Sequence, residues 1–123
     1  MQKILEEYPG GRLRVILVWE PVVSTDIAPP TTHALRRLFD PRASQLWDRE
    51  LSLSRSMRGD DDEVVWDYVA AFPAEVRWQD DLPEPAFEGS PVMDAIAELR
   101  RWLATQPRLR TDADPASPRR SPA

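Results

Sequence analysis

The sequence predicts an α/β fold, an incomplete layer in which helices pack on a mixed sheet of three strands. Two segments, 12–22 and 64–72, carry apolar side chains on both faces, which is typical of strands covered on both sides. Apolar residues at helical spacing occupy the segments around them. The length of 123 residues allows one hydrophobic core and leaves no room for a second. The expected element order is α-β-α-α-β-β-α.

The N-terminal part is expected to contain a short helix and then the clearest strand. Residues 2–8 carry apolar side chains on one helical face, and Pro9 with the glycines after it ends the helix. A helix this short has marginal stability by itself and must pack against another element. In the strand at 12–22, Pro21 ends the pairing, because proline cannot donate to a sheet ladder.

Two linked helices are expected between the apolar strands. After Pro29-Pro30, Thr31 or Thr32 caps a first helix that carries Leu35, Leu38 and Phe39. Asp40-Pro41 is typical of a new N-cap followed by proline at the first helical position, so a second helix is expected up to Gly59. The apolar face of this second helix is Ala43, Leu46, Trp47 and Leu51.

The acidic run at 60–63 is interpreted as a solvated loop, with a metal site as the weaker alternative. The long crossover makes the strand at 64–72 parallel to the first strand. Pro73-Ala74 then turns the chain into an antiparallel edge strand at 75–80, whose apolar and polar residues alternate.

The C-terminal part is expected to hold one long helix and a tail. Residues 81–91 form a loop broken by prolines, and Ser90 and Pro91 open the helix. Its apolar face is Val92, Ile96, Leu99 and Leu103. The domain is expected to cover 1–106. The segment 107–123 is rich in proline and arginine and is expected to be a disordered tail.

Composition excludes several classes of function. The chain has no cysteine, which removes disulfides, thiol redox chemistry and zinc sites built on sulfur. Its formal net charge of −5 argues against nucleic acid binding, which draws on clustered basic residues. No apolar run is long enough to span a membrane, and the N-terminus lacks the features of a secretory signal. We therefore expect a cytoplasmic protein with no cofactor and no metal.

Candidate site residues lie where the first strand ends. Ligands gather at the carboxyl ends of parallel strands, where Glu20 and the following loop with Asp26 are expected. With His33 just beyond the loop, these residues form a weak candidate for acid–base work or cation binding, although helix-start polar residues usually serve capping. Asp67 is a second candidate, because burial in an apolar strand would raise its pKa. The alternative for Asp67 is partial cover, or pairing with Arg36 or Arg37.

Several motifs together resemble a group of thioredoxin-like domain proteins of unassigned function. The resemblance covers roughly residues 2–104 and rests on Arg14-Val15-Ile16-Leu17-Val18-Trp19-Glu20-Pro21-Val22, Thr25-Asp26, Pro29-Pro30, Asp40-Pro41-Arg42, Trp47-Asp48, Val65-Trp66-Asp67-Tyr68 and Phe72-Pro73.

This resemblance implies a thioredoxin-type sandwich. Its Cys-x-x-Cys pair and first strand would lie before Met1, and Glu63 and Val64 stand where such enzymes place a cis-proline.

The expected function is a non-catalytic, thioredoxin-like interaction or scaffold module that binds a protein partner or a second copy of itself through an unpaired sheet edge. Without cysteine this chain cannot act as a dithiol oxidoreductase. Two alternatives stay open. One is a truncated thiol-disulfide oxidoreductase-like protein whose redox motif precedes Met1, and the other is a small enzyme that uses the Glu20, Asp26 and His33 loop.

Overall fold

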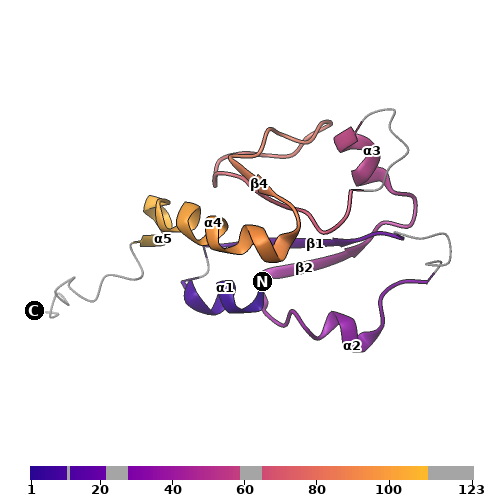
Figure 1. The fold of residues 1–123 in the computed structure, drawn as a ribbon, viewed down its shortest axis with the longest axis horizontal. Helices are drawn as coiled ribbons and strands as arrows, with labels where there is room; N and C mark the ends of the chain where they lie inside the picture. The colour runs from indigo at the N-terminus through magenta and orange to yellow at the C-terminus, as the bar shows by residue number, and fades with distance from the viewer. Residues whose placement is uncertain (11, 22–27, 59–64, 111–123) are drawn as a thin grey trace, which may run out of the picture.

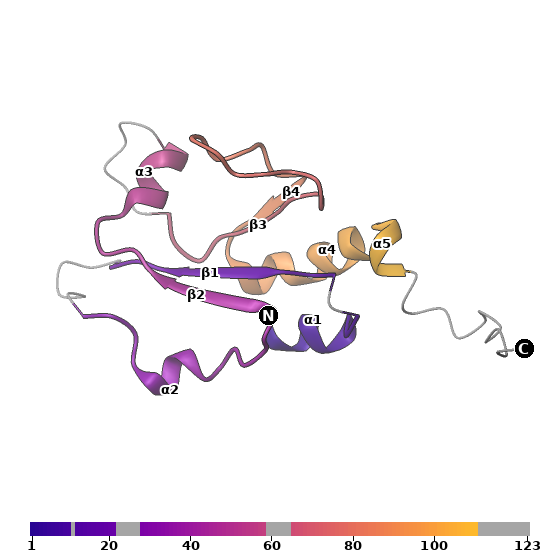
Figure 2. The ribbon, with the colours of Figure 1, turned by 180° about the vertical axis from the view of Figure 1, so that it is seen from behind.

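The computed structural model describes residues 1–10, 12–21, 28–58 and 65–110, and shows a mixed α/β arrangement with two small sheets. One sheet is a parallel pair, β1 and β2, and the other is an antiparallel pair, β3 and β4. In the views of Figures 1 and 2, α1 and α2 lie below the parallel strands, while α3 and the antiparallel sheet lie above them. The elements are α1 (Gln2–Glu7), β1 (Val15–Trp19), α2 (Thr32–Leu35), β2 (Ala43–Trp47), α3 (Ser52–Arg58), β3 (Val69–Ala71), β4 (Phe87–Gly89), α4 (Val92–Ala104) and α5 (Pro107–Arg110).

The parallel sheet corrects the prediction of a long second helix. Residues 43–47 form β2, which runs beside β1 with Val15 opposite Ala43 and Trp19 opposite Trp47. Exposure alternates along β2, as expected of a strand with one covered face. The predicted cap was wrong because the Asp40 carboxylate binds Arg42 instead of starting a helix. Only the last part of the predicted helix is helical, as α3.

The antiparallel sheet is also smaller than predicted, and its partner strand was placed wrongly. The expected strand at 64–72 is reduced to β3, and Asp67 before it has a φ of 50°, which interrupts extended backbone. The segment 75–80, which was expected to be an edge strand, is exposed and does not form a strand. β3 pairs instead with β4, from the segment predicted to be a loop. In the described residues the three-stranded sheet is thus replaced by two separate pairs.

The core lies where α1 and α4 meet the antiparallel sheet. Ile4, Leu99 and Leu103 are buried against one another, and Val69 and Phe87 pack on them. The predicted helices at both ends of the domain are therefore confirmed, with their apolar faces inward. Other partly buried side chains around this core are Tyr8, Leu13, Ala71, Ile96, Trp102 and Leu109.

Gly89 explains how closely α4 approaches β4. A Cβ atom at Gly89 would stand 2.6 Å from the Cβ atom of Ala95, which is nearer than such atoms come in proteins. Glycine on the strand and alanine on the helix therefore let the two backbones meet, and α4 contacts both strands of this sheet.

Arg42 fastens α1 to the rest of the fold. Its guanidinium group donates to the carbonyl oxygens of Tyr8 and of Leu5, the latter at 2.7 Å, and so satisfies carbonyl groups at the end of the helix. It also pairs with the Asp40 carboxylate at 2.8 Å. Hydrogen bonds from the Arg42 side chain and backbone lower the pKa of Asp40 to about 2.

The prediction of a disordered tail from residue 107 was wrong for its first four residues. Residues 107–110 form the short helix α5, and Leu109 packs on the core. The rest of that segment, 111–123, and the acidic run at 60–63 lie outside the described residues.

Candidate functional site

Two carboxyl groups stand side by side at the carboxyl ends of β1 and β2. Trp19 and Trp47 are the last paired residues of the parallel sheet, and Glu20 and Asp48 follow them directly. The Asp48 amide donates to the Trp19 carbonyl at 2.8 Å, so the two strands remain together at this point. Neighbouring strands lie about 4.8 Å apart, which brings the two side chains to the same place at the sheet end.

The first turn of α3 supplies donors to both carboxyl groups. Leu53 N donates to Asp48 Oδ2 at 2.8 Å, and Ser54 N donates to Glu20 Oε1 at 3.2 Å. The Ser54 hydroxyl donates to Glu20 Oε2 and accepts from Val65 N at 3.0 Å. Ser54 is 3% exposed, and it is the buried polar residue of the described structure. The strand ends, α3 and the chain at Val65 are thus joined at one point.

The two carboxyl groups shift each other's pKa. Burial raises the pKa of Glu20, and its hydrogen bond to Asp48 and the negative charge of Asp48 raise it further, although Ser54 acts in the opposite direction. Burial alone would raise the pKa of Asp48, but hydrogen bonds from the Leu53 and Ser52 backbone and from Glu20 lower it overall. Glu20 therefore holds a proton more strongly than Asp48 does, so when one of the two groups is protonated it is Glu20.

This arrangement can hold and release a proton, but it is not built for nucleophilic attack. The Ser54 hydroxyl is buried and already has both a donor and an acceptor partner. Within residues 1–10, 12–21, 28–58 and 65–110, no group of three or more His, Asp or Glu side chains could hold a metal ion. The site offers two carboxyl groups that can bind a proton and that both accept hydrogen bonds from α3.

The structure does not bring the predicted loop residues together. Glu20 lies at the site, but His33 is exposed on α2, where Thr31 accepts a hydrogen bond from Ala34 N as the predicted cap. Asp26 lies outside the described residues. Sequence reasoning missed Asp48, because the strand before it was predicted to be a helix. Exposure alternates along 43–47 in the structure, but the apolar residues Ala43, Leu46 and Trp47 stand at helical spacing, so the sequence held no signal of a strand that ends at Asp48.

Asp67, the other candidate, caps a helix. It is exposed rather than buried inside a strand, and its carboxylate accepts a hydrogen bond from Val92 N at 3.1 Å, at the start of α4. The Ser90 hydroxyl donates to the Asp67 carbonyl at 2.9 Å. Asp67 is thus not the buried carboxylate that was expected, and neither Arg36 nor Arg37 is its partner among the described contacts.

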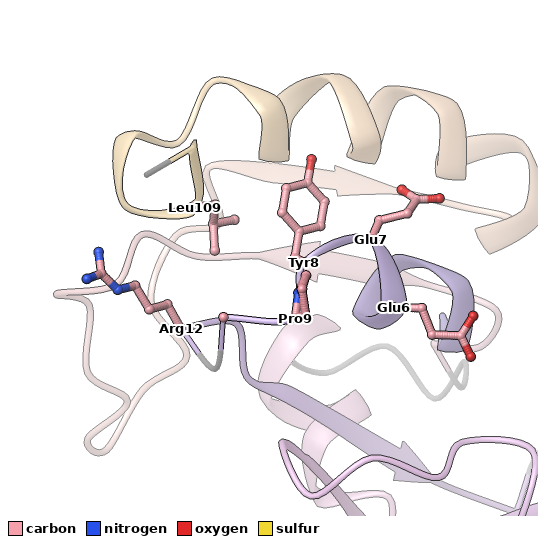
Figure 3. Close-up of a pocket in the computed structure, with 7 residues that line it drawn as sticks. Glu6, Glu7, Tyr8, Pro9, Arg12 and Leu109 are labelled. Carbon is pink, nitrogen blue, oxygen red and sulfur yellow. The ribbon is translucent and has the colours of Figure 1, made fainter. Parts of the chain in front are cut away.

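A cavity of about 300 Å³ lies between the end of α1 and α5. Figure 3 shows its labelled polar side chains, Glu6, Glu7 and Arg12, pointing in different directions rather than toward one point. Glu7 is paired with Arg100 at 3.0 Å, and Arg12 donates to the Arg108 carbonyl at 3.2 Å. The cavity therefore lacks the converging polar groups of a binding site.

Comparison with known protein families, with curated proteins and with solved structures gives no match for this chain. In the part of the chain that the structure describes, no helix is long and apolar enough to cross a membrane.

Proposed function

We propose that this domain is a non-catalytic interaction module that associates through the outer face of the β1–β2 sheet. The supporting observation is the exposure of apolar strand residues on that face. Ile16 is 61% exposed on β1 and Leu46 is 54% exposed on β2. Val18, opposite Leu46, shares the same face. Neither strand contains a charged residue, so this face has none of the charges that usually discourage association.

The opposite face of the same sheet supports a scaffold role, because hydrogen bonds hold it in place. Trp19 Nε1 donates to Gln45 Oε1 at 3.0 Å, and Gln45 Nε2 donates to the carbonyl oxygens of Leu35 and Leu38. One amide thereby links both strands to α2 and the segment after it. A partner would meet a sheet whose conformation is already fixed, which reduces the entropic cost of binding.

Strand edges supply a second element of the proposal. In the described residues β1 and β2 pair only with each other, so each has an edge whose backbone groups lack a strand partner. Such an edge can add a strand from another chain. That the chain has a thioredoxin-like domain, as its motifs suggest, is a separate proposal. The proposed association does not depend on it.

Self-association tests the proposal directly. We expect the purified chain to form dimers or larger species as its concentration rises in sedimentation equilibrium. We expect Leu46→Glu to raise the dissociation constant of this association at least tenfold. Met93→Glu is the matched control, because Met93 is 87% exposed and lies on α4, which is not part of this sheet. A wild-type chain that stays monomeric throughout, or equal effects of the two variants, would overturn the proposal.

A further inference from the structure

Two negative charges at the ends of β1 and β2 would oppose each other. The parallel register makes Glu20 and Asp48 neighbours across the sheet, and like charges in neighbouring strand positions are destabilising. Both side chains must stay at this place, because consecutive amides of α3, those of Leu53 and Ser54, donate to them. Separating the charges would therefore break hydrogen bonds between the carboxyl groups and α3.

We propose that the Glu20–Asp48 pair is a pH-sensitive latch, which holds α3 against the sheet end while it shares a proton and releases α3 when that proton is lost. This regulatory device goes beyond the proposed association function and stands on separate observations. The geometric basis is the shared location of the two carboxyl groups and their joint attachment to one helix turn.

The other charged groups nearby do not replace this interaction. Arg49 and Glu50, in the turn between β2 and α3, and Arg55 on α3 are exposed. On the segment that begins at Val65, the carboxylate of Asp67 is engaged with the start of α4. Asp48 is the charged group that acts on Glu20, and Glu20 is the one that acts on Asp48, among the described residues.

The direction of the pH effect follows from the two pKa shifts. The pKa of Glu20 is raised above its ordinary value of 4.5, so its contribution to stability is complete below that pH and is lost as the pH rises through the folded-state pKa. The pKa of Asp48 is lowered from 3.8, so its contribution is lost only in stronger acid. The latch is therefore closed near pH 4.5 and opens as the pH rises through the folded-state pKa of Glu20.

Hydrogen exchange of the α3 amides tests the latch. After correction for the intrinsic exchange rate, we expect protection of peptides covering 49–58 to fall between pH 4.5 and pH 7.5. The opening equilibrium rises by up to about tenfold per pH unit until the pKa of Glu20 is passed. In Glu20→Gln the amide donates to Asp48 at every pH and still accepts from Ser54, so protection should be independent of pH over this range.

Two further variants keep the test decisive. Asp48→Asn removes the opposing charge and should also abolish the pH dependence, so it carries the test if Glu20→Gln does not fold. Glu50→Gln, which removes the same charge from an exposed position in the adjoining turn, should retain the wild-type profile. Protection in the wild type that is constant or rises with pH would refute the latch, and so would a wild-type profile in a folded Glu20→Gln or Asp48→Asn variant.

Discussion

The Asp67 carboxylate caps α4 from a distant part of the chain: its Oδ1 atom lies 3.1 Å from the backbone nitrogen of Val92, which is 25 residues further along. The residue directly before α4 is Pro91, whose side chain cannot accept a hydrogen bond. The helix that carries most of the core therefore depends on a residue from the turn before β3 for its N-terminal hydrogen bond.

Removing this cap should weaken the whole domain. We expect Asp67→Ala to lower the free energy of unfolding by about 1 kcal/mol, the usual value of an N-cap. Asp67→Asn should cost less, because asparagine keeps the acceptor and tolerates the positive φ of 50°. Urea denaturation measures both changes. An exposed control, Glu84→Ala, should be neutral, and a loss in Asp67→Asn as large as in Asp67→Ala would contradict the capping role.

The contact between Gly89 and Ala95 should be intolerant of added volume. We expect Gly89→Ala to destabilise the domain by about 1–3 kcal/mol, as overpacking in a core does, because the new Cβ atom would collide with that of Ala95. The double variant Gly89→Ala, Ala95→Gly removes the collision and should recover part of this loss, apart from the cost of glycine inside a helix. A double-mutant cycle in urea shows the coupling, and purely additive effects would exclude the predicted collision.

Attachment of α1 should depend on Arg42 and weaken in strong acid. The pKa of Asp40 is lowered from 3.8 to about 2, so its stabilising effect is present above pH 3.8 and is lost as the pH falls through 2. We expect thermal unfolding temperatures to fall over this range, and Asp40→Asn to reduce the change. Arg42→Lys should loosen α1 at neutral pH, because lysine lacks the planar fork that reaches both helix carbonyls and Asp40. Unaltered exchange of the α1 amides in Arg42→Lys would contradict this assignment.

Elements with a strong local pattern could be predicted from the sequence. The apolar repeat that includes Leu99 and Leu103 predicted α4, the run at 15–19 predicted β1, and a threonine cap predicted α2. Half of the candidate site could be predicted in the same way, because Glu20 directly follows an apolar strand. In these segments the hydrophobic period and the capping residue agree with the final packing.

The rest depended on which segments meet. Asp40-Pro41 carries the pattern of a helix start, yet Arg42 reaches the carbonyls of α1 and recruits the Asp40 carboxylate, and the next residues pair with β1. Asp48 lies beside Glu20 only because β2 pairs with β1. Likewise, β3 pairs with β4 rather than with the segment at 75–80, which is nearer in sequence. The sequence by itself determined α1, α2 and α4, the first strand, the absence of thiol chemistry and the acidic charge. Tertiary structure decided strand partners and the carboxyl pair, because those depend on contacts between distant residues, which local periodicity does not encode.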